Sequence, residues 1–207
     1  MTAIYHITHI RNLPSILEHG CLWCDTERLA RGLNTVGIAH QHIKDRRARR
    51  PVPVSQRGTL ADYVPFHFAP RSPMLYSIYR GNVEGYTEGQ RPVLHLVSTA
   101  EQVVRSDLPF AFTNGHAEMA TSHFYEDLTD LNNVDWTIMQ ATYWKDTPDD
   151  GTRKWRRQAE FLVHNRFPVS LIGEIGVISS QRAEEVKQIL AAAGSEIQVA
   201  VRPNWYY

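Results

Sequence analysis

The sequence predicts an α+β fold for this chain of 207 residues. Expected strands and helices mix along the chain without the regular strand–helix–strand alternation of a doubly wound sheet. The length suits one domain with a sizeable core, so we expect residues 1–207 to form a single domain. The sequence shows neither an internal repeat nor a low-complexity segment.

The expected strands are short apolar runs bounded by turn residues. They lie at about 3–7, 64–68, 93–97, 110–112, 158–164, 172–178 and 196–201. Pro65 falls near the start of its strand, where a missing backbone donor is tolerated. The segment at 113–116, which contains Asn-Gly, is expected to be a turn after the strand at 110–112.

The expected helices begin at residues that favour helix N-termini. Asn12 and Pro14 open a short helix that Gly20 ends, and Ser72 followed by Pro73 opens another through residue 79. Further helices are expected at about 25–29, 41–47, 100–105 and 181–193, with two more between 118 and 143. Residues 32–62, rich in arginine and interrupted by prolines, are expected to form a flap with helix only near 41–47.

The formal net charge is zero, with 22 basic and 22 acidic residues, so no overall field attracts a polyanion. Any contact with nucleic acid must come from local patches. Two basic patches exist, one formed by Lys44, Arg46, Arg47, Arg49 and Arg50, the other by Arg153, Lys154, Arg156 and Arg157. Either patch taken alone is more often a solvated helix face or loop than a binding site.

Several common kinds of site are not indicated. Cys21 and Cys24 have C-x-x-C spacing, but no second knuckle supplies the other zinc ligands and no βαβ context supports a redox pair, so we expect reduced thiols. The glycine motifs of the common nucleotide-binding folds and the G-x-S-x-G motif of hydrolases are absent. We find no signal peptide and no apolar run of membrane-spanning length, and we expect a cytoplasmic protein.

One carboxylate lies near the start of an apolar run. Glu160 lies in the segment QAEFLV, where burial would disfavour its charged form unless cations or hydrogen bonds compensate. Alternation puts Glu160 on the same strand face as Gln158 and His164, and for such a carboxylate solvent is the commonest partner. The pattern therefore predicts the orientation of Glu160, while its partner stays open.

Blocks in a fixed order carry a resemblance to a known family. They are YHITHI and NLPSIL (5–10 and 12–17), YVPFHFAPRSPMLY (63–76), FTNGHA (112–117) and QAEFLV (158–163). This set resembles the DarT family, the toxins of DarT–DarG systems, over nearly the whole chain. The resemblance implies an ADP-ribosyltransferase fold related to poly-ADP-ribose polymerases, with central split mixed or antiparallel β-sheets flanked by helices.

The same resemblance implies the reaction and its partners. A DarT enzyme transfers ADP-ribose from NAD to a thymine base in single-stranded DNA, in a sequence-dependent manner, and releases nicotinamide. NAD is the co-substrate, no metal is required, no membrane is involved, and a macrodomain antitoxin (DarG) removes the adduct. Two alternatives stay open: an ADP-ribosyltransferase that modifies RNA or protein, and a non-catalytic module that binds NAD or nucleic acid.

The resemblance also assigns residues to NAD. His6 matches the family's ribose-binding position and is expected to donate to a ribose hydroxyl, with Thr8 on the same strand face. Glu160 matches the catalytic glutamate, which would stabilise positive charge on the ribose and help to remove a proton from the acceptor. Tyr76 could stack on the nicotinamide, although a core role is at least as common for a tyrosine at this helical spacing.

The important arginine of the family falls in the first basic patch. We favour Arg47 and Arg50 as catalytic residues and Arg46 as a contact to NAD, because a guanidinium binds phosphate with two hydrogen bonds.

The resemblance places a substrate-selecting loop at about 118–157. This region offers Trp136, Tyr143, Trp144 and Trp155 for stacking, and we expect only a minority of these rings to touch a base. The DNA-binding candidates are His116, Trp155, Arg153, Lys154, Arg156 and Arg157. For His116, the sequence supports a turn-stabilising role and a binding role equally.

Overall fold

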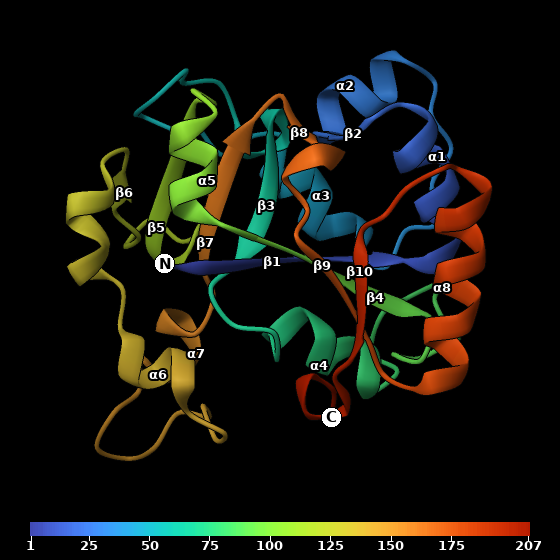
Figure 1. The fold of residues 1–207 in the computed structure, drawn as a ribbon. Helices are drawn as coiled ribbons and strands as arrows, with labels where there is room; N and C mark the ends of the chain where they lie inside the picture. The colour runs from blue at the N-terminus through green and yellow to red at the C-terminus, as the bar shows by residue number, and fades with distance from the viewer.

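A computed structural model describes residues 1–207. Its centre is an eight-stranded sheet in the order β10-β9-β4-β1-β3-β7-β5-β6 (Figure 1). The strands are β1 (Ala3–His9), β3 (Tyr63–His67), β4 (Val93–Thr99), β5 (Phe110–His116), β6 (Phe124–Tyr125), β7 (Ala159–His164), β9 (Glu174–Val177) and β10 (Gln198–Val201). Strands β9 and β10 pair in parallel, and the other neighbours pair antiparallel. A separate ladder joins β2 (Cys21–Trp23) to β8 (Arg166–Pro168).

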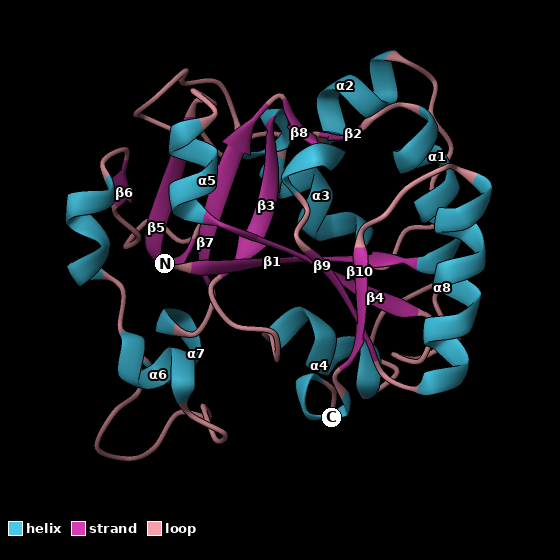
Figure 2. Ribbon diagram, in the orientation of Figure 1, coloured by secondary structure: helices cyan, strands magenta, loops and turns pink.

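The large sheet is split between β1 and β3. Strand β1 pairs with β4 along its whole length, and β3 pairs with β7 in the same way. Between β1 and β3 the register contains only Tyr5 opposite His67, supplemented by a hydrogen bond of 2.8 Å between His6 Nδ1 and the Pro65 carbonyl. Figure 2 shows the two halves running in different directions, with β1 crossing near the ends of β3 and β7. The expected split sheet is therefore confirmed.

Eight α-helices flank the sheet. They are α1 (Leu13–Glu18), α2 (Asp25–Ala30), α3 (Gln41–Arg47), α4 (Pro73–Tyr79), α5 (Ala100–Arg105), α6 (Trp136–Gln140), α7 (Arg153–Arg156) and α8 (Ser180–Ala192). Side-chain caps begin several of them as expected, for example the Ser72 hydroxyl, which accepts from the Leu75 N–H at 3.1 Å. No helix has both the length and the apolar composition needed to cross a bilayer. Both cysteines are buried free thiols, and the Cys24 sulfur caps α2.

Strand β7 is covered on both faces, which decides the environment of Glu160. Phe161 and Val163 belong to the main apolar core, whereas Leu162 packs in a smaller cluster with Leu60 and Val52 from the flap at 32–62. The face shared by Glu160 and Leu162 is therefore covered by protein near Leu162. Glu160 itself is only 6% exposed, so solvent is not its principal partner.

Two expected elements differ from the structure. Residues 113–116 continue β5 instead of turning, because they pair with β6 and, after an irregularity, with β7. Gly115 lies under the Trp155 indole, which a Cβ atom would approach to 2.2 Å, so this glycine serves close packing. The first of the two helices expected between 118 and 143 is a 3₁₀ stretch at Leu128–Asn133.

Candidate active site

A cavity of about 850 Å³ lies along the split in the sheet. His6 and Thr8 of β1, His67 of β3 and Glu160 of β7 line it, and the flap covers it through α3 and the loop before α3. The volume falls in the range of cofactor and small-molecule sites. Groups from both halves of the sheet thus face one shared cavity.

Glu160 is the carboxylate on the floor of this cavity. Its backbone N–H donates to the Thr113 hydroxyl at 3.1 Å, and its Oε2 accepts from Arg47 Nη1 at 2.8 Å. Burial raises the pKa of Glu160, but the charge and hydrogen bond of Arg47 together with the nearby His116 and His67 outweigh burial, and the net shift is downward. Glu160 is therefore ionised at neutral pH.

Arg47 is the arginine of the flap that reaches Glu160. Its side chain is 12% exposed, and its Nη2 is buried without a hydrogen-bond partner. A guanidinium with one half bound to a carboxylate and the other half free is suited to a second acceptor in the cavity.

The other two candidates of this patch hold the flap to the body of the protein. Arg46 Nε pairs with Glu118 Oε2 at 2.8 Å, and Arg50 donates to the carbonyls of Ala117 and Met119 at 3.2 and 3.1 Å. Neither Arg46 nor Arg50 lines the cavity. The structure therefore separates Arg47 from its two neighbours, which the sequence could not do.

The hydrogen bonds of His6 and His116 define what each offers to a ligand. Because a carbonyl only accepts, His6 Nδ1 carries the proton in the bond to Pro65, which leaves Nε2 as an acceptor. Burial lowers the pKa of His6, so it is neutral. The expected donation from His6 to a ribose hydroxyl is thus reversed, and the hydroxyl would donate to Nε2. His116 is the opposite case, since the Glu118 N–H donates to its Nδ1 at 3.3 Å and Nε2 keeps the proton.

Among the lining residues that were not singled out from the sequence, His67 and Asn12 have contacts that bear on the site. His67 lies opposite Glu160 in the β3–β7 register, and burial lowers its pKa to about 4, so it is neutral as well. Asn12 donates to the Thr8 hydroxyl at 3.1 Å and bonds the Val36 backbone in both directions, which ties the flap to β1. The register of β3 against β7 would have revealed His67, but register is not visible in a local pattern.

Tyr76 lines the cavity from α4 and also packs in the protein. Its ring meets Trp144 and Tyr207 edge-on, with centroids 5.7 and 5.0 Å away. The position of Tyr76 is therefore compatible both with stacking on the nicotinamide and with a role in the core.

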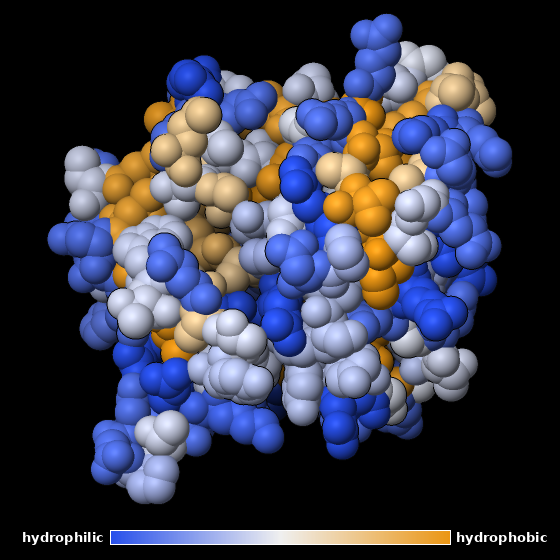
Figure 3. Space-filling model, turned by 60° about the horizontal axis from the view of Figure 1, so that its bottom comes forward, coloured by the Kyte–Doolittle hydropathy of each residue, from blue (hydrophilic) through white to orange (hydrophobic).

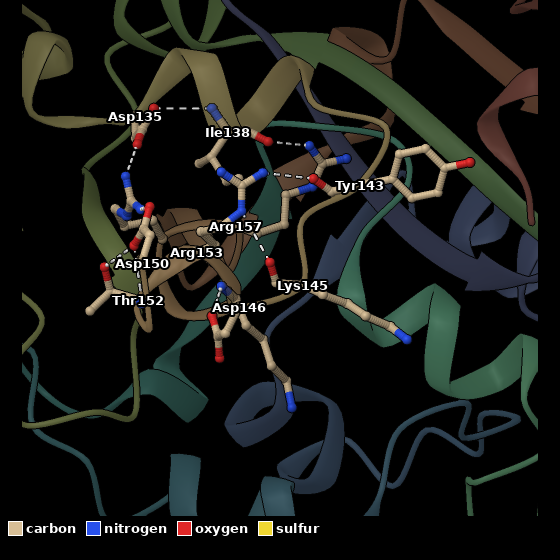
Figure 4. A network of polar contacts seen from close by, with 11 residues as sticks. Asp135, Ile138, Tyr143, Lys145, Asp146, Asp150, Thr152, Arg153 and Arg157 are labelled. Carbon is tan, nitrogen blue, oxygen red and sulfur yellow. Dashed lines mark hydrogen bonds and ion pairs between the residues drawn. The ribbon is translucent and has the colours of Figure 1, made fainter. Parts of the chain in front are cut away.

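Most of the second basic patch is used inside the protein. Buried Arg157 donates to the carbonyls of Ile138, Met139 and Arg71, and Arg156 pairs with Asp135 and Asp150. Figure 4 shows this network around α6 and α7.

Two further DNA-binding candidates of the segment 153–157, Trp155 and Lys154, lie in different surroundings. Trp155 covers Gly115 and donates to the Ser122 hydroxyl at 3.0 Å. Lys154 lines the cavity. Of the expected phosphate-binding residues, Arg156 and Arg157 therefore have donors committed to the protein, because tertiary contacts take up the charges that the sequence pattern displays.

Comparisons with known proteins agree with this geometry. A family model described as "DarT: ssDNA thymidine ADP-ribosyltransferase" matches residues 5–207. A DNA ADP-ribosyl transferase from Thermus sp. (strain 2.9) is 45% identical over the whole chain, which covers 96% of that relative. A fusion of a DNA ADP-ribosyl transferase with a DNA ADP-ribosyl glycohydrolase from Thermosipho africanus is 26% identical, and the chain covers 49% of it.

Solved structures give the same result. The fold matches Thermus sp. 2.9 DarT in complex with ADP-ribosylated single-stranded DNA with a TM-score of 0.93, covering 100% of this chain and 96% of that one. For the same protein in complex with NAD+ the TM-score is 0.90 at 43% identity, covering 100% and 98%. The matched range and the shared fold confirm the resemblance seen in the sequence: the chain belongs to the DarT family of single-stranded-DNA thymidine ADP-ribosyltransferases.

Proposed function

We propose that the cavity binds NAD and an unpaired thymine base, and that Glu160 and Arg47 carry out the transfer of ADP-ribose between them. The observation that carries this proposal is the ion pair of Arg47 and Glu160 on the cavity floor, together with the unpaired Arg47 Nη2. In the reaction the bond between the nicotinamide nitrogen and ribose C1′ breaks. A bond between C1′ and a ring nitrogen of thymine forms, and the proton of that nitrogen is lost.

The lining of the cavity fits NAD. His6 Nε2 can accept from a ribose hydroxyl, Thr8 lies on the same face of β1, and Tyr76 supplies an aromatic surface. The bound Thermus relative supports this placement, because its fold matches over the whole chain. His6, Thr8 and Tyr76 are thus the proposed NAD contacts, whereas Arg46 acts by anchoring the flap.

Glu160 serves the reaction in two ways. Its charge stabilises the positive charge that develops on the ribose as nicotinamide leaves. It then accepts the proton of the thymine ring nitrogen. If the Arg47 fork turns to a base carbonyl, Glu160 loses the cation that lowers its pKa, and burial then raises that pKa and makes the carboxylate a better base.

The acceptor has to be single-stranded. A ring nitrogen on the Watson–Crick edge of a base is not accessible while the base is paired, so the base must be unpaired or flipped out. His116 Nε2 and Lys154 are donors at the cavity that can contact the base or its phosphate. We propose these two as DNA contacts.

A partner that reverses the modification follows from the family. The Thermosipho relative joins a transferase to a glycohydrolase in one chain. We propose that this protein is a toxin whose product is removed by a separate macrodomain antitoxin of the DarG type.

The test is an acceptor comparison. The protein is incubated with NAD and, separately, with single-stranded DNA, RNA and protein, and nicotinamide release and the mass of each acceptor are measured. We expect one ADP-ribosyl mass on oligonucleotides that contain thymine and none on those that lack it. Modification of RNA or protein alone would support the alternative acceptor, and no nicotinamide release with any acceptor would support a binding module.

A further inference from the structure

Four aromatic side chains of the 118–157 region are candidates for base stacking, and the structure uses three of them internally. Trp136 donates to the Leu131 carbonyl at 2.9 Å, and Trp144, 8% exposed, donates to the Tyr207 hydroxyl at 3.2 Å. Trp155 donates to Ser122 and covers Gly115. Tyr143 is 85% exposed, so its ring is the available one.

The backbone under Tyr143 is held in place by a single guanidinium. Arg153 Nη2 donates to the Tyr143 carbonyl at 2.8 Å, and Arg153 Nε donates to the Lys145 carbonyl at 3.0 Å. The Lys154 N–H also donates to Asp146 Oδ1 at 2.8 Å, which fixes the next residue of the segment. A ring on an immobilised backbone needs little further ordering when it binds a ligand.

The side chains of this segment alternate between protein and solvent. Trp144 is buried, whereas Tyr143 and Lys145 on either side of it are exposed. Figure 4 shows the side chains of Tyr143 and Lys145 leaving the network on the same side, away from Asp135 and Asp150. Trp144 and Lys145 line the cavity, and Tyr143, which does not line it, directly precedes them in the chain.

A large exposed aromatic ring and an exposed lysine two residues apart, which extend to the same side, form a suitable surface for a nucleotide. Bases stack on aromatic rings in single-stranded nucleic acid sites, and lysines bind the phosphates between them. On the face in Figure 3, apolar patches are separated by hydrophilic side chains, so the molecule has no continuous apolar surface there.

We propose that Tyr143 and Lys145 bind a nucleotide adjacent to the target thymine, with the Tyr143 ring on its base and the Lys145 ammonium on its phosphate. Arg153 is then a positioning residue that holds both backbones and does not itself touch DNA. This inference rests on the proposed function, because it assumes that the cavity receives a thymine of single-stranded DNA. It adds a subsite that contributes to the choice of sequence around the target.

The first experiment pairs protein variants with altered oligonucleotides. Oligonucleotides with one thymine carry an abasic site at a single position within two nucleotides on either side of it. On the intact oligonucleotide, Tyr143→Ala should raise the KM for DNA by about 5- to 150-fold, the range found for loss of one stacked base, with a smaller effect on kcat. Tyr143→Phe should retain the wild-type KM.

The abasic oligonucleotides locate the base. At one flanking position, the abasic site should raise the KM of the wild type but cause no further loss in Tyr143→Ala. An equal effect of Tyr143→Ala on every oligonucleotide would overturn the proposal, because the ring would then contact no flanking base. If the wild type modifies no DNA at all, the proposed function fails, which is a separate result.

The second experiment measures binding without transfer. In Glu160→Gln protein, the slope of log affinity for single-stranded DNA against log salt should fall by about 0.7 when Lys145→Ala is added, as expected for one phosphate contact. Lys187→Ala, an exposed lysine on α8 that does not line the cavity, is the matched control and should leave the slope unchanged. An unchanged slope in Lys145→Ala would remove the phosphate contact from the proposal.

Arg153→Lys tests the positioning role. Lysine keeps the charge but does not form the two-pronged bond to both carbonyls. We expect this variant to lose the discrimination between intact and abasic oligonucleotides while the salt slope stays at the wild-type value. A fall in the slope instead would show that Arg153 contacts a phosphate directly.

Discussion

Replacing Glu160 by glutamine should separate its role in the reaction from its role in the fold. Glutamine keeps the shape of the side chain but removes the charge that would oppose a positive ribose. Loss of one such electrostatic contact costs about 2.7–4 kcal/mol of transition-state stabilisation, so kcat should fall by about 10²–10³-fold. Nicotinamide release and the mass of a thymine oligonucleotide measure this directly.

The same substitution weakens the ion pair with Arg47. Breaking a fully buried pair costs about 3–5 kcal/mol. Arg47 faces an open cavity, and a hydrogen bond to glutamine remains possible, so we expect a loss of about 2 kcal/mol, the size of a hydrogen bond to a charged group. Thermal unfolding should show a midpoint about 4–8 °C lower.

Glu118 provides a matched control for this experiment. Its side chain is only 7% exposed, and it also pairs with a flap arginine at 2.8 Å, but it does not line the cavity. Because Arg46 is 59% exposed, Glu118→Gln should lose no more stability than Glu160→Gln, and it should keep a rate within a few-fold of the wild type. Equal rate losses in both variants would show that Glu160 acts by holding the flap, and the catalytic assignment would be wrong.

Three further outcomes are expected. Arg47→Lys should lower the transfer rate by about 10²-fold or more, because lysine lacks the planar fork that can contact Glu160 and a second acceptor at once. A wild-type rate in this variant would exclude the proposed role of Arg47. Arg157→Met leaves carbonyls in the α6 region without a donor and should lower the free energy of unfolding by about 3 kcal/mol in urea denaturation, whereas a loss below about 1 kcal/mol would contradict the structural role. Burial lowers the pKa of His95 to about 4 from an ordinary value of 6.5, so on acidification the unfolded chain takes up this proton first. The free energy of unfolding should therefore fall between about pH 6.5 and pH 4, by about 3 kcal/mol from this residue, and His95→Gln should lack that part of the decline.

Local signals predicted the elements that depend on local chemistry. The helix that Ser72 and Pro73 open and the helix capped by Thr99 lie where the sequence places them, because caps and prolines act over a few residues. Strands β2, β6 and β8 were missed, since two or three residues give too short a pattern to distinguish. The Asn-Gly pair at 114–115 suggested a turn, but pairing with β7 and the packing of Trp155 override that preference.

The residues of the candidate site also divide into those that the sequence revealed and those that depend on tertiary structure. Glu160 and His6 were found through the family resemblance, and their strand alternation was visible. The sequence did not show which of Arg46, Arg47 and Arg50 reaches the site. That choice depends on which side chains of α3 and of the residues after it face the cavity. The basic stretch at 153–157 looked like a surface for phosphates, whereas backbone carbonyls distant in sequence accept most of its donors.

The narrow join between β1 and β3 makes the enzyme sensitive to the spacing between the two halves of its sheet. One residue pair and the His6–Pro65 hydrogen bond set the spacing between the proposed ribose acceptor on one half of the sheet and the carboxylate on the other. A displacement of about 1 Å in such a geometry costs about a hundredfold in rate. A ligand that wedges these two strands apart would therefore silence the enzyme by separating His6 from Glu160, although every side chain of the site would still be present.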